Sequence, residues 1–140
     1  MSAMQRNKGA SAERIVARLI REWLGLEVRR NWQAQSAAGG ADLTGIPGWS
    51  IEIKRAKAFR HDWWDQAEEQ ADAWNTIPAL IYLLDYSRRG QAPIDRWRVI
   101  LPINAFSRLD VDEGLTADIS LRAWLQLARE TLPVPTPTPE

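Results

Sequence analysis

The chain has 140 residues, which is enough for one domain with a substantial core but not for two. It contains no cysteine and a single histidine, so disulfides, thiolate nucleophiles and metal sites built from cysteines or two histidines are excluded. A metal would have to be held by carboxylates, whose hard oxygen atoms favour Mg²⁺ or Mn²⁺. No apolar run approaches the roughly 20 residues that cross a bilayer, and the first residues lack the apolar core of a signal peptide. We therefore expect a cytoplasmic protein with no membrane partner.

The formal net charge of zero hides an asymmetry along the chain. Residues 1–60 contain 11 Lys/Arg and 5 Asp/Glu, a net charge of +6, whereas residues 61–140 contain 7 and 13, a net charge of −6. A basic region suits a polyanionic partner, because each neutralised phosphate releases counterions. The two halves would equally well neutralise each other across the fold or a dimer interface, so charge alone does not identify the partner.

The predicted elements start with a polar segment, residues 1–10, that we expect to be irregular. A helix over 11–24 follows, with Ser11 as its cap, because apolar residues recur there at helical spacing. Short strands are predicted at 27–32 and 41–44, separated by a polar connection rich in small residues.

The clearest strand covers residues 49–54, where apolar and polar side chains alternate. One face carries Trp49, Ile51 and Ile53, and the other carries Ser50, Glu52 and Lys54. A helix over 62–75 leads from there to an apolar strand over 79–84, and a helix between two strands predicts a crossover that joins parallel strands. A further strand is predicted at 96–101.

A last helix is predicted over 120–130, with Asp118 or Ser120 as its cap. The order of elements indicates an α/β fold, a mixed sheet flanked by helices. We expect a single domain over residues 1–132, followed by a Pro/Thr-rich tail (133–140) that is extended because proline cannot continue a helix.

Two carboxylates and an amine are predicted to meet on the alternating strand. Glu52 and Lys54 leave the same face, and the turn at 45–48 would bring Asp42 beside Glu52. Neighbouring carboxylates repel unless a cation lies between them or one is protonated. A divalent ion would take oxygen atoms from Asp42, Glu52 and the Ile53 carbonyl, and Lys54 would neighbour the attacked phosphate. The alternative is a solvated polar face on an antiparallel hairpin, which accounts for Glu52 and Lys54 but makes no use of Asp42.

Three segments resemble the core motifs of the PD-(D/E)XK nuclease superfamily: Lys8–Arg14, Gly40–Leu43 and Ile51–Arg55. Within it, they are most similar to the archaeal-type Holliday junction resolvases and their phage-encoded relatives. The resemblance covers residues 8–55 well and continues to about residue 101 only in pattern, and Ala41 stands at the position of the namesake proline. It implies a restriction-endonuclease-like core and magnesium-dependent cutting of branched DNA by a homodimer.

The resemblance also implies roles for individual residues. Asp42 and Glu52 match the metal-binding acids, and Lys54 matches the catalytic lysine. Glu13 matches an acid on the first helix that reaches the metal through water or orients the lysine. Ser36 resembles a loop serine that touches the substrate phosphate.

Several further residues are candidates for contact with DNA. Gln66 or Gln70 would match an active-site glutamine of several superfamily nucleases, although a surface glutamine fits equally well. His61 could contact DNA or relay a proton, and it could also be incidental. The basic and polar residues that we assign to phosphate binding are Lys8, Arg14, Arg30, Ser36, Arg55, Lys57 and Arg60.

Eight tryptophans in a chain of this length are unusual. Trp23, Trp49 and Trp74 lie on apolar patterns and are predicted to be in the core. Trp63 and Trp64 are adjacent on a helix, so at least one should face outward. They could stack on unpaired bases or pack at a dimer interface, and we favour the interface.

Taken together, the sequence predicts a Mg²⁺-dependent endodeoxyribonuclease that cuts branched DNA as a homodimer. Two alternatives remain open. One is a restriction- or repair-type nuclease that acts on duplex or single-stranded DNA with the same chemistry. The other is a nuclease-fold module that binds DNA without cutting it.

Overall fold

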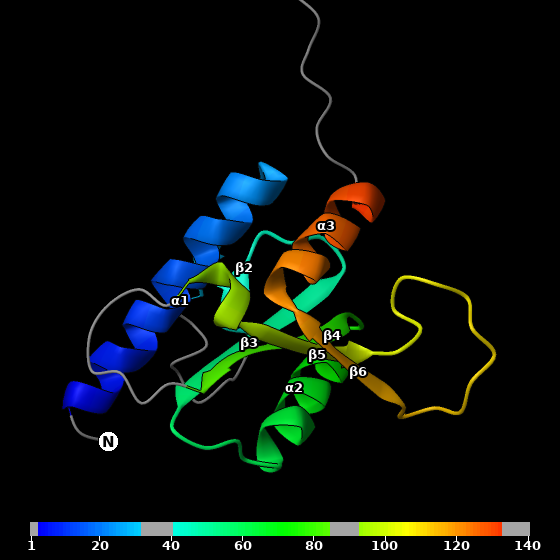
Figure 1. Cartoon of the computed structure of the whole chain (residues 1–140). Helices are drawn as coiled ribbons and strands as arrows, with labels where there is room; N and C mark the ends of the chain where they lie inside the picture. Colours follow the sequence, from blue (N-terminus) through cyan, green and yellow to red (C-terminus); the bar gives the residue numbers. More distant parts are fainter. Residues whose placement is uncertain (1–2, 32–40, 85–92, 133–140) are drawn as a thin grey trace, which may run out of the picture.

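The computed structural model describes residues 3–31, 41–84 and 93–132, the first eight of them as backbone only. Figure 1 shows these residues as one sheet with helices on both of its faces. Ser36 and the predicted tail at 133–140 lie outside the described residues. Within the described part of the chain, no helix combines the length and apolar character that crossing a bilayer requires.

A six-stranded sheet forms the centre of the molecule, in the order β1-β2-β3-β4-β5-β6. The strands are β1 (Arg29–Arg30), β2 (Leu43–Thr44), β3 (Trp49–Ala56), β4 (Ile77–Leu84), β5 (Arg98–Pro102) and β6 (Thr116–Ser120). The β3–β4 pair is parallel and the other four pairs are antiparallel. The mixed α/β sheet is therefore confirmed, and it is consistent with a restriction-endonuclease-like core.

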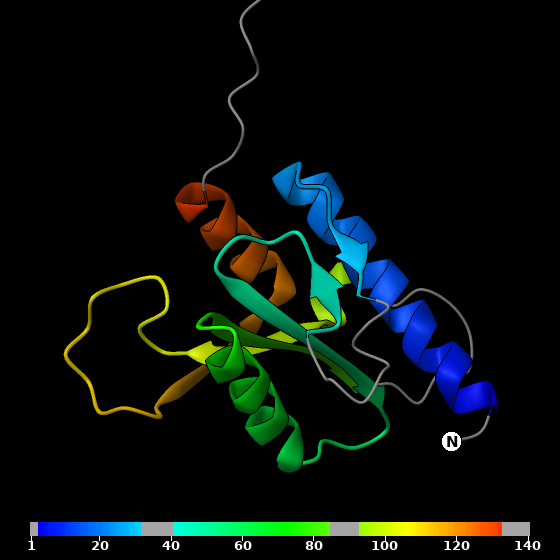
Figure 2. The same ribbon diagram turned by 180° about the vertical axis from the view of Figure 1, so that it is seen from behind.

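In the described residues, three α-helices and a short 3₁₀ helix surround the sheet: α1 (Ala3–Leu24), α2 (Asp62–Ala73), η2 (Ile94–Arg96) and α3 (Leu121–Thr131). The two views in Figures 1 and 2 place α1 and α3 on one face and α2 on the other. Because α2 connects β3 to β4, it is the predicted crossover between parallel strands.

The hydrophobic core is divided by the sheet. On the side of α1 and α3, Ile51 and Ile53 of β3 pack in a large cluster with Ile20 and the fully buried Trp124. On the other side, a smaller cluster joins Trp63 and Ala67 of α2 to Leu80 and Tyr82 of β4. The side chains of β3 alternate between these two clusters.

The register of β3 confirms the predicted alternation. Glu52 pairs with Leu80 and Lys54 with Tyr82, so both polar residues share the face that α2 covers. Ser50 and Glu52 are nevertheless buried. A strand with a neighbour on each side and helices on both faces leaves little solvent contact for either set of side chains.

The first helix is longer than predicted. It begins at Ala3, so the expectation that residues 1–10 are irregular was wrong, and Ser11 lies inside the helix rather than capping it. The segment 3–10 contains alanine, methionine, glutamine, arginine and lysine, all good helix formers, with no proline to stop the helix. The prediction gave too much weight to the lack of apolar periodicity there.

Strand β6 was missed entirely. It pairs with β5, with Val99 opposite Ile119 and Ile100 opposite Asp118. Asp118 therefore lies in a strand and does not cap α3, whereas the predicted alternative is confirmed because the Ser120 hydroxyl accepts a hydrogen bond from Ala123 N at 3.0 Å. An edge strand of five residues with polar positions gives only a weak periodic signal.

The tryptophans only partly follow the predictions. Trp49 is buried between Phe106 and Trp124, but Trp74 is 69% exposed, so its assignment to the core was wrong. The last residue of α2 is Ala73, so the helical periodicity that placed Trp74 inward ends before it. Trp63 is buried, so the interface predicted for the Trp63–Trp64 pair loses one of its two residues.

Candidate active site

Asp42 is held between β1 and β3 by its backbone. Its N–H donates to the Ile51 carbonyl at 2.8 Å, and its carbonyl accepts from Asn31 N at 2.9 Å. One carboxylate oxygen, Oδ2, accepts from Ile53 N at 2.7 Å. Three hydrogen bonds therefore fix both the position and the direction of this acid.

The turn between β2 and β3 places Asp42 opposite Glu52. Leu43 pairs with Ile51 in antiparallel register, so the next residues outward, Asp42 and Glu52, face each other. Gly45 makes this turn possible, because its φ is +100° and a Cβ there would lie 2.4 Å from the Glu27 carbonyl oxygen. The predicted approach of the two acids through the turn at 45–48 is thus built into the backbone.

Glu52 is buried, and its two carboxylate oxygens have different surroundings. Oε1 lies 3.9 Å from Lys54 Nζ. Oε2 is buried and has no hydrogen-bond partner among the described residues. A buried carboxylate oxygen without a partner is costly, since burial removes its water ligands. This atom is the strongest indication that a ligand belongs here.

Burial raises the pKa of both acids. Burial raises the pKa of Glu52 to about 8, and the neighbouring Asp42 charge adds to the effect while Lys54 opposes it. Burial also raises the pKa of Asp42 to about 6, although the hydrogen bond from Ile53 N lowers it. Two nearby carboxylates that resist ionisation are the situation that a divalent cation relieves.

The donor set fits a hard cation. Asp42 and Glu52 offer carboxylate oxygens, and in a strand the N–H and C=O of one residue point to the same neighbour. Because Ile53 N donates to Asp42, the Ile53 carbonyl also points to the side of the strand on which Asp42 lies. Among the described residues, no group of three or more acids or histidines is arranged to hold a metal. The set is therefore a carboxylate pair plus a carbonyl, which suits Mg²⁺ with several of its water ligands retained.

Glu13 is near the pair but is bound to another partner. Arg30 Nε donates to its Oε2 at 2.6 Å, and both side chains are largely buried. The charge of Glu13 still raises the pKa of both Asp42 and Glu52, so it lies within electrostatic reach of them. Arg30 was predicted to bind phosphate, but the Nε of its guanidinium already donates to Glu13.

The other residues that were predicted to contact DNA differ in their exposure and in their partners. Arg14, Lys57, Arg60 and Gln66 are exposed, and Arg55 is half-buried. Arg60 pairs with Asp62 at 3.2 Å. His61 is exposed at the start of α2, where its side chain makes no capping hydrogen bond and its ring lies 6.1 Å from that of Phe59. The side chain of Lys8 lies outside the described residues.

A second polar cluster on the same face was not predicted. The Tyr82 hydroxyl donates to Asp118 Oδ2, and Arg98 Nε donates to Asp118 Oδ1 at 2.9 Å. Burial and the Asp118 carboxylate raise the pKa of Tyr82 to about 12. Tyr82 is the register partner of Lys54, so this cluster lies one strand away from the acids. Recognising it required β6, which had not been predicted.

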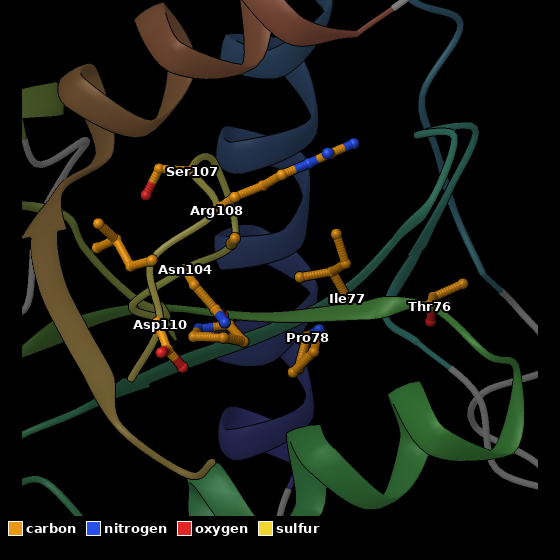
Figure 3. A pocket seen from close by; sticks show the side chains of 10 residues that line it. Thr76, Ile77, Pro78, Asn104, Ser107, Arg108 and Asp110 are labelled. Atoms are coloured by element: carbon orange, nitrogen blue, oxygen red, sulfur yellow. The ribbon is translucent and has the colours of Figure 1, made fainter. Parts of the chain in front are cut away.

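A hollow of about 600 Å³, shown in Figure 3, lies where β4 begins and β5 ends. Its lining includes Ile77, Pro78, Asn104 and Arg108. Ile77 pairs with Trp49, three residues before Glu52, so the hollow is displaced from Glu52 along the strands by about 10 Å at 3.3 Å per residue. The acid pair and this hollow are therefore separate features of the molecule.

Comparison with known protein families identifies a family for this chain. A sequence model of the family described as "Phage putative PDDEXK endonuclease" matches residues 4–122, which include all of α1 except Ala3 and all six strands of the sheet. A search of curated proteins finds no match. The matched region contains every residue of the acid pair and its surroundings.

Proposed function

The chain belongs to this family of phage PDDEXK endonucleases, and from that premise we propose that it is a Mg²⁺- or Mn²⁺-dependent endodeoxyribonuclease that cuts branched DNA. The observation that carries the proposal is the buried, unpartnered Oε2 of Glu52 beside Asp42, with Lys54 on the same face. A pair of acids kept out of water, with an amine next to it, is poorly explained as a support of the fold.

The roles of the residues follow from their positions. Asp42, Glu52 and the Ile53 carbonyl would hold the ion, which when bound supplies Lewis-acid stabilisation of charge on a phosphate and a site for water. Ile53 N fixes the Asp42 carboxylate, so one of its oxygens stays directed at Glu52. Lys54, 3.9 Å from Glu52, would direct a positive charge at the phosphate oxygen on which negative charge develops.

The test is cutting of labelled four-way junctions, linear duplexes and single strands with Mg²⁺, Mn²⁺ or EDTA. We expect metal-dependent cutting that is fastest on the junction. The Lys54→Ala variant should cut about 10²- to 10³-fold more slowly while its Mg²⁺ affinity changes little, as for loss of one charge-stabilising donor. Equal rates on junction and duplex would refute the preference for branched DNA, and undiminished cutting by Lys54→Ala would refute the role of the lysine.

The homodimer is also part of the proposal. It is supported by the sequence resemblance to resolvases and by exposed apolar side chains, namely Trp74, Ile103, Leu109 and Leu115. Two copies related by a twofold axis would present two equal sites to two strands. Light scattering on the purified protein should give twice the mass of 15.9 kDa calculated for the chain. A mass equal to that of one chain would refute the dimer.

A module that binds DNA without cutting is the second candidate, favoured by one observation. Arg30 neutralises Glu13, so the third acid expected near the site does not join the other two. This alternative predicts DNA binding that is insensitive to Mg²⁺ and no cleavage of any substrate in the assay above.

A further inference from the structure

The two helices on opposite sides of β3 carry opposite charge on their exposed faces. On α1, three arginines are exposed at spacings of four and three residues: Arg14, Arg18 and Arg21. Residues at such spacings lie on one face of a helix. On α2, the exposed charged residues are all acidic: Asp62, Asp65, Glu69 and Asp72.

The arginines on α1 are only weakly neutralised by neighbours. Arg18 lies 3.9 Å from Glu22, and the two side chains are 44% and 61% exposed, so this ion pair contributes little. Arg21 donates from Nη1 to the Val28 carbonyl at 2.8 Å, which holds its guanidinium beside the start of β1. The next residue after Val28 is the exposed Arg29. We call Arg14, Arg18, Arg21 and Arg29 the arginine ridge.

The acids on α2 repel one another. Burial raises the pKa of Glu68, and the charges of Asp65 and Asp72 raise it further. No lysine or arginine occurs within α2 to offset them. A polyanion would therefore be repelled from this helix, at distances up to the Debye length of roughly 8 Å at physiological salt.

The arginine ridge starts one residue after Glu13 on α1. The charge of Glu13 reaches both Asp42 and Glu52. Arg29 lies on β1, two strands from β3. From Arg14 to Arg21 the helix rises about 10 Å, at 1.5 Å per residue, which corresponds to about three base pairs of duplex. The ridge thus runs along α1, which lies on the other face of the sheet from α2 (Figures 1 and 2).

We propose that the arginine ridge binds the phosphate backbone of a DNA arm and leads it away from the acid pair along α1, while the acids of α2 repel DNA from the exposed surface of that helix. The inference rests on the proposed nuclease function and adds the path of the substrate. It assigns phosphate contacts to Arg18, Arg21 and Arg29, in addition to the previously predicted Arg14.

The test is the salt dependence of DNA binding, measured by fluorescence anisotropy with a labelled duplex in EDTA so that no cutting occurs. The Arg14→Ala/Arg18→Ala variant should bind at least 10-fold more weakly than the wild type. Its slope of log affinity against log salt should fall by about 1 to 2, because each lost phosphate contact on duplex DNA removes about 0.9.

The matched control is Arg108→Ala/Arg122→Ala, which removes the same charge from two exposed positions off the ridge. It should keep the wild-type slope and affinity. Equal losses in the ridge and control variants would overturn the proposal, because they would show a response to net charge alone. An unchanged slope in the ridge variant would overturn it as well.

Two further variants test the arginine ridge at its other positions. Arg21→Lys retains the charge beside β1 and should bind like the wild type, whereas Arg29→Ala, which leaves α1 unaltered, should lower the slope by about 0.9. Thermal unfolding identifies any variant that fails to fold. If the wild type binds duplex in EDTA but cuts no substrate with Mg²⁺, the proposed nuclease function is refuted, while the proposal that the arginine ridge binds DNA is not.

Discussion

Two polar clusters lie on the α2 face of the sheet, one at β2–β3 and one at β4–β6, and they differ in how their charges are matched. In the second, Asp118 accepts from both Tyr82 and Arg98, so the carboxylate is paired with a cation and a hydroxyl. In the first, Asp42 faces Glu52, and one glutamate oxygen has no partner among the described residues.

The difference teaches how to separate a structural polar cluster from a functional one. A carboxylate that supports a fold is expected to have its hydrogen-bonding capacity filled, because an unfilled buried oxygen destabilises the native state. Burial of an acid pair, which raises its pKa values, lowers stability instead, and this cost is typical of a site that binds a ligand. Removing an acid from each cluster should therefore have opposite consequences.

The largest expected effect is on cutting. Asp42→Asn should lower the rate of DNA cleavage by about 10³-fold or more, since it removes a carboxylate of the proposed metal site. Asp118→Asn should retain cleavage within a few-fold but destabilise the protein by about 1–3 kcal/mol, because the amide keeps only one of the two oxygens that accept from Arg98 and Tyr82 and loses the charge that pairs with Arg98. Single-turnover cleavage and thermal unfolding of both variants provide the comparison. A loss of cutting in Asp118→Asn without a loss of stability would contradict the distinction.

The next largest effect is a pH-dependent gain in stability of the Glu52→Gln variant over the wild type. In the metal-free folded protein the pKa of Glu52 is raised to about 8, whereas its ordinary pKa is 4.5, so the carboxyl keeps its proton up to about pH 8. Between these values the folded state binds more protons than the unfolded state, so stability falls as the pH rises through this window. Glu52→Gln cannot lose a proton, and should exceed the wild type at pH 8.5 by roughly 1–3 kcal/mol while matching it near pH 4.

With Mg²⁺ present, the wild type should instead be more stable than the Glu52→Gln variant. Only the wild type would retain both carboxylates, and binding to the folded state raises its unfolding temperature by mass action. Thermal unfolding at pH 4.5, 7 and 8.5, in EDTA and with excess Mg²⁺, measures both parts. If Glu52→Gln is less stable than the wild type in EDTA at pH 8.5, the glutamate has a stabilising role that the acid pair does not predict.

How much of this contrast could be predicted from the sequence depends on how far apart in the chain the interacting residues are. Glu52 and Lys54 are two residues apart, so the alternation of a strand places them together, and the turn at 45–48 brings in Asp42. Glu13 and Arg30 are separated by 17 residues, and Tyr82 and Asp118 by 36. Contacts of that kind depend on how separate elements pack, which no local pattern records.

The long-range contacts also explain the errors. The resemblance to a nuclease family placed Glu13 near the metal site but gave no indication that Arg30 would pair with it. Asp118 was predicted, as an alternative to Ser120, to cap the last helix, and only the pairing of β6 with β5 places it beside Arg98. The residues of the proposed site were thus accessible from sequence, and the groups that restrain them were not.

The smallest expected effect tests whether the second cluster is only structural. Tyr82→Phe removes the hydroxyl that donates to Asp118 and leaves the ring packed against Phe59 and Trp63. Arg98 still satisfies Asp118, so we expect a loss of about 0.5–1.5 kcal/mol in the free energy of unfolding. Tyr82 is the register partner of Lys54, so a catalytic role for its hydroxyl would appear as slower cutting. Because the hydroxyl is bound to Asp118 and a pKa of about 12 keeps it protonated, it is unsuited to take up a proton, and Tyr82→Phe should cut DNA at the wild-type rate between pH 6 and 9.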